Sequence, residues 1–297
     1  YLGADGIVEA LKEGADIVIT GRVADPSLFL APLMYEFGWD PKDMERIGLG
    51  ILCGHLMECS SQVCGGYFVD PGFKDVENLA ELGFPFADVN EKGELIIGKL
   101  EHSGGLVSEA TVKEQILYEI QDPAAYFTPD GTADFSKVIV KQIEKNRVSI
   151  TNAKCKEDNG KYKVSIGYKD GFLGEGQISY GGPGCYNRAK LAGEIIEERL
   201  KNANLKEVKI DYIGLNSLFY RIDEELAQTM REIRLRVLGK TATFEEAQII
   251  GNEVEALYLN GPAGGGGAEK SVRETIAIGS IFVDRKEVPF SVKLTES

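Results

Sequence analysis

The chain has 297 residues, of which 43% are hydrophobic and 27% are charged. A chain of this length and composition can bury a sizeable core, which excludes an intrinsically disordered protein. Its formal net charge of −14 argues against nucleic acid as a partner, because that binding depends on basic groups, and against a general attraction to anionic membranes. The sequence has no apolar run of about 18 residues, as a membrane-spanning helix requires, and we expect no signal peptide.

The cysteine pattern bears on the cellular compartment. Five cysteines are present, with Cys53, Cys59 and Cys64 close together and Cys155 and Cys185 isolated. This sparse, odd-numbered set resembles no disulfide framework and indicates a reducing environment. We therefore expect a cytoplasmic protein.

The first predicted elements form half of a βαβ unit. The apolar stripe of residues 7–13 predicts a helix, and Gly14 is placed to end it. Residues 15–20 (ADIVIT) are continuously apolar, as in strands buried on both faces of a parallel sheet. Because the chain begins with Tyr1 and enters this helix almost at once, we expect that an upstream part is missing.

A polar loop, residues 21–27 (GRVADPS), follows directly after that predicted strand. Open α/β sheets place their ligands at the carboxyl ends of strands, so Arg22 or Asp25 can contact a substrate. The alternative is structural: Arg22 pairs with Asp25, and Asp25 or Ser27 caps a helix that begins near Pro26.

From about residue 131 the composition of the sequence changes to runs of β-branched residues that alternate with polar residues. Helices are predicted at 28–37, 108–120, 186–203 and 243–258, strands at 94–98, 138–140, 148–150, 162–168, 176–180, 206–215, 233–238, 276–283 and 290–294, and hairpin turns at Asp158-Asn159-Gly160 and Lys169-Asp170-Gly171. We expect an α/β domain over residues 1–130, the N-terminal part of an incomplete parallel sheet, and an α+β domain with antiparallel strands over residues 131–297.

The stretch with the densest chemistry is residues 54–67 (GHLMECSSQVCGGY). On a helix, His55, Glu58, Cys59 and Gln62 would share one face, because they are spaced at i, i+3, i+4 and i+7. Such a face is usually apolar, whereas this one would carry a base, an acid, a thiol and an amide. An imidazole and a carboxylate at this spacing can share a proton, and a thiol can act as a nucleophile with the histidine as its base.

Two other interpretations of this stretch stay open. Zinc could be bound by His55, Glu58 and Cys59, although no further ligand cluster is present to complete the shell. The polar groups could also simply satisfy one another in a buried helix. His102 lies in a turn before a predicted helix, where an anion site and an exposed loop are both consistent with the pattern.

Glycine-rich segments are the remaining candidates for ligand contact. Gly65 and Gly66 end the central stretch, Gly181-Gly182-Pro183-Gly184 precedes a helix, and residues 261–267 (GPAGGGG) lie between a helix and a strand. Glycine allows a close approach of the backbone to an acyl carbonyl or a phosphate, although a flexible loop explains such runs equally well. The runs do not match the phosphate-loop or dinucleotide fingerprints, and hydrolase, zincin and thioredoxin-like motifs are absent from the sequence.

Several of these segments together resemble the acyclic terpene utilisation AtuA family, formerly a family of unknown function. The resemblance rests on residues 15–39 (ADIVITGRVADPSLFLAPLMYEFGW), 54–72 (GHLMECSSQVCGGYFVDPG), 82–89 (LGFPFADV), 111–130 (TVKEQILYEIQDPAAYFTPD), 178–184 (ISYGGPG) and 261–267 (GPAGGGG). The proteins of this family are longer at the N-terminus, so the chain resembles the later part of such a protein.

The resemblance implies a role in the catabolism of acyclic terpenes and related branched acids, where the family occurs with acyl-CoA degradation enzymes and acyl-CoA carboxylases. We expect an enzyme of the lyase or hydratase type that uses acid–base chemistry on a branched acyl-CoA thioester or a hydroxy or carboxy acid. The alternative is a non-catalytic binding or assembly subunit for an acyl-CoA carboxylase.

From the residue patterns we expect His55, Glu58 and Cys59 to be catalytic. The expected substrate-binding residues are Arg22, Asp25, Gln62, Gly65, Gly66, Gly264 and Gly265. No metal or other cofactor is expected, and an acyl-CoA thioester is a candidate substrate. The expected partners are a small-molecule substrate, further copies of the chain in a homo-oligomer, and the missing N-terminal portion or an acyl-CoA carboxylase, but neither nucleic acid nor a membrane.

Overall fold

The computed structural model describes residues 1–157, 160–205, 207–219 and 221–295. The chain forms two compact units, the first made of Tyr1–Val164 with Ser280–Ser297 and the second of Ser165–Gly279. These units divide the chain at other positions than the expected domains 1–130 and 131–297.

The first unit contains four α-helices within the described residues. They are α1 (Asp5–Lys12), α2 (Ser27–Phe37), α3 (Met44–Met57) and α4 (Glu109–Leu117). Asp43 caps α3 by accepting a hydrogen bond from the backbone N–H of Arg46. Glycine is required where α3 meets its neighbours, because a Cβ at Gly54 would lie 2.5 Å from the carbonyl oxygen of Pro26.

Two antiparallel sheets complete the first unit. One has the order β1-β2-β6-β5 and the other the order β3-β4-β7. Their strands are β1 (Pro85–Val89), β2 (Leu95–Lys99), β3 (Tyr126–Thr128), β4 (Gly131–Asp134), β5 (Ile139–Glu144), β6 (Arg147–Thr151) and β7 (Lys154–Lys156). Short 3-10 helices lie at η1 (Ser60–Cys64), η2 (Leu79–Glu81) and η3 (Arg285–Glu287).

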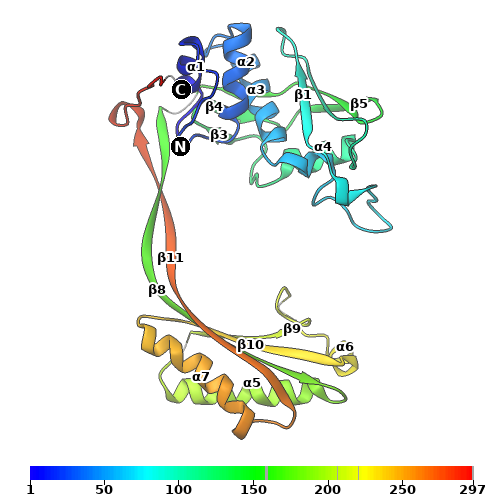
Figure 1. The fold of residues 1–297 in the computed structure, drawn as a ribbon, viewed down its shortest axis with the longest axis vertical. Coiled ribbons are helices and arrows are strands. Elements are labelled where there is room, and N and C mark those ends of the chain that lie inside the picture. Colours follow the sequence, from blue (N-terminus) through cyan, green and yellow to red (C-terminus); the bar gives the residue numbers. More distant parts are fainter. Residues whose placement is uncertain (158–159, 206, 220, 296–297) are drawn as a thin grey trace. The chain divides into compact units, whose positions relative to one another are not determined.

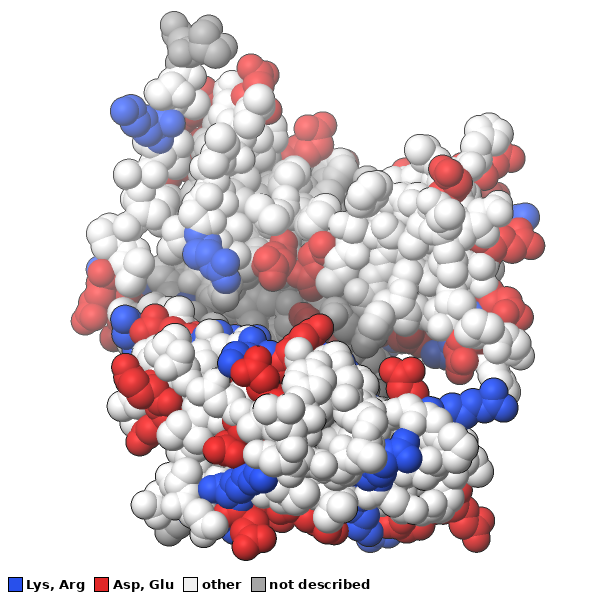
Figure 2. Space-filling model, turned by 60° about the horizontal axis from the view of Figure 1, so that its bottom comes forward, with Lys and Arg blue, Asp and Glu red and all other residues white. Residues whose placement is uncertain are grey.

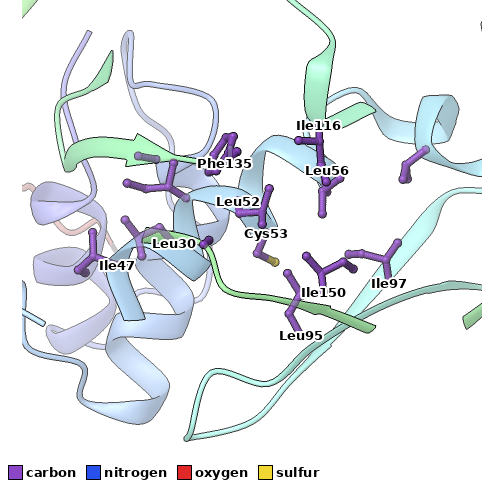
Figure 3. Close-up of a cluster of buried hydrophobic side chains, with 14 of the residues drawn as sticks. Leu30, Ile47, Leu52, Cys53, Leu56, Leu95, Ile97, Ile116, Phe135 and Ile150 are labelled. Atoms are coloured by element: carbon purple, nitrogen blue, oxygen red, sulfur yellow. The ribbon is translucent and has the colours of Figure 1, made fainter. Parts of the chain in front are cut away.

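The core of the first unit lies between α3 and these sheets. Leu52, Cys53 and Leu56 on α3 point toward Ile97 and Ile150 from the sheet (Figure 3). Leu52, Leu56, Ile97 and Ile150 have no exposed surface. Burying one such side chain stabilises the fold by roughly 1.5–3 kcal/mol, so this cluster fixes the position of the C-terminal end of α3.

The predicted buried strand at residues 15–20 is wrong. These residues adopt no strand conformation, and the side chains of Ile17 and Ile19 are 83% and 93% exposed. An apolar run becomes a buried strand only when neighbouring strands pair with it, and within the described ranges this region makes only an isolated parallel bridge between Leu2 and Val23. The broader expectation of helices combined with antiparallel sheets is confirmed.

The second unit is a four-stranded sheet with the order β11-β8-β10-β9 and helices on one face (Figure 1). In chain order its elements are β8 (Lys161–Gly181), α5 (Cys185–Asn202), β9 (Val208–Ile213), α6 (Glu224–Thr229), β10 (Glu232–Thr241), α7 (Phe244–Asn260) and β11 (Gly265–Asp284). Both β8 and β9 run antiparallel to β10, which lies between them. The order of strands and long helices is that of the ferredoxin-like split βαβ arrangement.

Alternation along β10 explains which face the helices cover. Ile233, Leu235 and Val237 are fully buried against α5 and α7, whereas Arg234 and Arg236, on the other face, are partly exposed. This two-residue period is that of a sheet with one covered face.

Several expectations for the later part of the chain are corrected. Residues 169–171 form no hairpin turn, because they lie inside the single long strand β8, which pairs with β11. Residues 290–294 form no strand. The predicted turn at 158–160 and the predicted start of a strand at residue 206 lie outside the described residues.

Candidate functional site

The central stretch changes conformation after Glu58. His55 lies in the last turn of α3, Glu58 is its C-terminal cap, and η1 begins at Ser60, which has a φ of 52°. The single helix face predicted through Gln62 is therefore wrong, since the chain turns between Cys59 and Gln62. The structure does bring His55 and Glu58 together.

The imidazole of His55 is hydrogen-bonded on both sides. Nδ1 lies 2.9 Å from Oε1 of Glu58, and Nε2 lies 3.3 Å from the carbonyl oxygen of Ile116. A carbonyl only accepts, so a hydrogen bond to Ile116 requires the proton on Nε2, while Nδ1 faces the Glu58 carboxyl. With 1% exposure, His55 has no free nitrogen for a substrate, and Oε2 of Glu58 is buried without a hydrogen-bond partner.

Residues from distant parts of the chain hold the imidazole in place. The ring of Tyr126 lies 5.2 Å from it and the ring of Phe135 lies 5.9 Å from it, centroid to centroid. The side-chain nitrogen of Gln115 donates to the backbone oxygen of His55 at 3.2 Å, while Oε1 of Gln115 is buried without a partner. His55 is thus a fixed support for Glu58.

Three carboxylates act electrostatically on the thiol of Cys59. Burial raises the pKa of Cys59, and Glu58, Glu119 and Asp25 raise it further, while a hydrogen bond with Gln115 opposes them. Burial and the same three carboxylates also raise the pKa of Tyr126. A thiol whose pKa is raised stays protonated near neutral pH, so Cys59 is poorly suited to act as a nucleophile.

Asp25 therefore belongs to this cluster, whereas Arg22 does not. The guanidinium of Arg22 donates to the hydroxyl oxygen of Tyr1 at 2.7 Å and lies 4.9 Å from the centre of its ring. Within the described ranges no ion pair joins Arg22 to Asp25, and no side-chain cap is formed at the start of α2. The structural alternative proposed for this loop is therefore wrong.

A groove of about 840 Å³ has Glu119 in its lining, whereas Glu58 and Cys59 do not line it. Its aromatic lining includes Tyr67, Phe68, Phe73 and Tyr118, and its polar lining includes Gln62, Lys74, Lys113, Glu114 and Glu119. Glu119 links the groove to the cluster, since its carboxylate acts on the pKa values of both Cys59 and Tyr126. The groove offers apolar surface with a few charged groups, as binding sites for small molecules do.

Unusual backbone conformations occur around this groove. Among the described residues, those other than glycine and asparagine with positive φ are Ser60, Tyr67 and Glu119, at 52°, 62° and 59°. Tyr67 and Glu119 line the groove, and Ser60 follows Cys59. Each such residue costs about 1–3 kcal/mol and persists where surrounding structure imposes it, often at binding sites.

The four glycines predicted to bind substrate belong to different units of the chain. Gly65 has a φ of 98° and ends η1, and a Cβ at Gly66 would lie 3.1 Å from the carbonyl oxygen of Ser61, so both shape the turn that leads to Tyr67. Gly264 and Gly265 belong to the second unit, at the start of β11.

The described residues contain no group of three or more His, Cys, Asp or Glu side chains that could hold a metal ion. The structure adds Gln115, Tyr118, Glu119 and Tyr126, which sequence reasoning did not single out. All four lie within residues 111–130, a segment that carries the family resemblance and is dense in aromatic and acidic side chains. This density of aromatic and acidic side chains is the sequence feature from which these four residues could have been predicted.

No helix in the described part of the chain has the length and apolar character needed to cross a membrane. Searches among curated proteins and among solved structures found no match. A family model described as "Acyclic terpene utilisation family protein AtuA" matches residues 1–294. The match covers nearly the whole chain, so this protein belongs to the acyclic terpene utilisation family AtuA.

Proposed function

We propose that this chain is an enzyme of branched acyl thioester or terpenoid acid catabolism, of the lyase or hydratase type. The observation that carries the proposal is the Glu58 carboxylate, which His55 holds through one oxygen while the other oxygen is buried and has no hydrogen-bond partner. A carboxylate that is held in one orientation and keeps an oxygen without a partner is suited to proton transfer.

Each group then has a defined task. Glu58 removes a proton from the carbon next to the carbonyl, and the electron pair of the broken C–H bond forms the C=C bond. The C–O bond on the next carbon breaks, and the hydroxyl group leaves as water with the proton that Glu58 returns to it. Hydration is the reverse sequence. His55 is a positioning residue, because its nitrogens are engaged by Glu58 and the Ile116 carbonyl.

The groove supplies binding. Its aromatic walls at Tyr67, Phe73 and Tyr118 suit a branched hydrocarbon chain, and Gln62 offers an amide to the carbonyl group. Lys74 and Lys113 at the groove are paired with Glu114 and Glu109, at 2.6 Å and 2.9 Å. The role expected for Arg22, binding an anionic group of the substrate, stays a prediction.

A substrate screen tests the proposal. The purified chain is incubated with a mixture of branched acyl-CoA thioesters and their hydroxy derivatives, and the products are analysed by mass spectrometry for a gain or loss of water. We expect turnover of at least one branched thioester. No turnover by the chain, alone or with its cellular partners added, would reject the enzymatic proposal.

A second function has its own supporting observation, the exposed apolar side chains of Ile17 and Ile19. These residues line a groove of about 1400 Å³ with Val18, Val23 and Phe290. An apolar surface of this kind is suited to protein contact, as in a non-catalytic assembly subunit for an acyl-CoA carboxylase. Co-purification that is lost in the double variant Ile17→Ser/Ile19→Ser, without activity of the chain itself, would favour this function.

A further inference from the structure

Two glycine-rich loops meet at one edge of the second unit. The loop at residues 181–184 joins β8 to α5, and the loop at residues 261–264 leads into β11. Since β8 and β11 are neighbouring strands, a Cβ at Gly265 would lie only 2.9 Å from a carbon of Ile178 and 3.3 Å from the ring of Tyr180. The two loops are therefore held side by side by the sheet.

The N-terminus of α5 opens at this edge. This helix has 18 residues, no side-chain cap and no acidic residue in its first turn. No described group accepts a hydrogen bond from the backbone N–H of Tyr186 or Asn187. An uncapped N-terminus concentrates partial positive charge and N–H donors, which favours an anion.

Arg188 points its guanidinium back into the first loop. Nη1 donates to the carbonyl oxygen of Pro183 at 3.0 Å, and Nη2 donates to the carbonyl oxygen of Gly181. Nε is buried and has no partner. The guanidinium is thus fixed in orientation and keeps one N–H for another acceptor.

Tyr180 supplies an observation that is independent of the helix end. Its side chain is fully buried, yet its hydroxyl oxygen has no hydrogen-bond partner. The ring carbon that bears this hydroxyl lies against Gly265, since a Cβ at Gly265 would lie 3.4 Å from it, and burial raises the pKa of Tyr180 while Arg188 opposes this effect. A buried hydroxyl without a partner is costly, and a bound acceptor would remove that cost.

We propose that the second unit binds the phosphate group of a small molecule at this edge, between the two glycine-rich loops. Arg188, the first N–H groups of α5 and the Tyr180 hydroxyl provide donors from different directions, which suits a tetrahedral anion with several acceptor oxygens. The chain has a net charge of −14, and on the face drawn in Figure 2 acidic side chains lie among the basic ones. Binding must therefore depend on these local donors rather than on a basic surface.

Calorimetric titration of the full chain tests the proposal, with inorganic phosphate, pyrophosphate and acetate as probes. We expect phosphate and pyrophosphate to bind at least tenfold more tightly than acetate. Arg188→Gln is expected to weaken phosphate binding tenfold or more, and Tyr180→Phe several-fold. The matched control Lys201→Gln removes one charge near the other end of α5 and should leave binding unchanged.

The proposal is overturned if folded wild-type protein binds neither probe at millimolar concentration, or if acetate binds as tightly as phosphate. It is also overturned if Arg188→Gln and Tyr180→Phe bind phosphate like the wild type. Should Arg188→Gln fail to fold, the nearly isosteric Tyr180→Phe decides the question by itself. The result is separate from the proposal for Glu58, because neither variant alters the first unit.

Discussion

Nδ1 of His55 lies 2.9 Å from Oε1 of Glu58 at the C-terminal end of α3, and the other nitrogen of the ring lies 3.3 Å from the carbonyl oxygen of Ile116. The imidazole therefore ties the end of α3 to α4 while it orients a carboxylate. Because His55 is buried and Glu58 keeps one oxygen without a partner, substitutions at the two positions should differ in their effects.

Substitution of Glu58 should affect activity far more than folding. Glu58→Gln keeps the shape and one acceptor oxygen but removes the base, so turnover in the substrate screen should fall about 10²- to 10⁴-fold. Glu45→Gln, an exposed position on the same helix, is the matched control. Wild-type turnover by a folded Glu58→Gln protein would reject the assigned role.

Substitution of His55 should lower stability as well as activity. His55→Ala removes a ring packed against Tyr126 and Phe135 and leaves the Ile116 carbonyl without its donor, so we expect a loss of about 2–4 kcal/mol in the free energy of unfolding. Urea denaturation measures this loss. His102→Ala, at the exposed second histidine, should change stability by about 0.5 kcal/mol or less.

The close contact between α3 and the start of α2 predicts that Gly54 tolerates no side chain. A Cβ there would lie 2.5 Å from both the Cα and the carbonyl oxygen of Pro26, so Gly54→Ala should destabilise the protein by about 1–3 kcal/mol. Gly21→Ala is the control, because a Cβ at Gly21 meets no atom within 4 Å. Equal thermal unfolding midpoints for the two variants would contradict this contact.

Two buried thiols predict a loss of stability at high pH. Burial raises the pKa of Cys53 from 9.0 to about 12 and that of Cys64 from 9.0 to about 11. The thiol pKa values of the folded protein exceed the value of 9.0 in the unfolded chain, so the unfolded chain loses its thiol protons first as the pH rises. The stability that comes from burying neutral thiols is therefore complete below pH 9.0 and is lost as the pH rises toward 11 and 12. Urea denaturation at pH 7 and pH 10.5 should show this decline.

The control for the thiol prediction is the double variant Cys53→Ala/Cys64→Ala. It is expected to be less stable than the wild type at pH 7, because it leaves space in the core, but to lose less stability between pH 7 and pH 10.5. An identical pH dependence in the two proteins would show that other groups cause the decline.

Helices and side-chain pairs that depend only on neighbouring residues in the chain could be predicted from the sequence. The helices predicted at 28–37, 186–203 and 243–258 appear as α2, α5 and α7. Their evidence is local, such as the amphipathic pattern of 186–203 and the capping box that Thr243 and Glu246 form at the start of α7. The pairing of His55 with Glu58 is local in the same sense, since residues three positions apart on a helix are neighbours.

Other features depended on contacts that no local pattern contains. The ADIVIT run has the composition of a buried strand, yet Ile17 and Ile19 are exposed because pairing decides whether such a run becomes a strand. Likewise, the Lys169-Asp170-Gly171 sequence suits a turn but lies within β8, where pairing with β11 keeps the chain extended.

The sequence by itself determined the mixture of helices and strands, the family, and the choice of His55 and Glu58 for the candidate site. Periodicity, shared motifs and the spacing of these two residues are local features that need no tertiary structure. Tertiary structure alone decided that Gln115, Tyr126 and Phe135 contact His55, that Asp25 acts electrostatically on Cys59 while Arg22 contacts Tyr1, and that Arg188 donates to the backbone at the end of β8, the strand that carries Tyr180. The physical reason is that burial and hydrogen bonding depend on neighbours brought together by folding, some of them 60 or more residues apart in the chain.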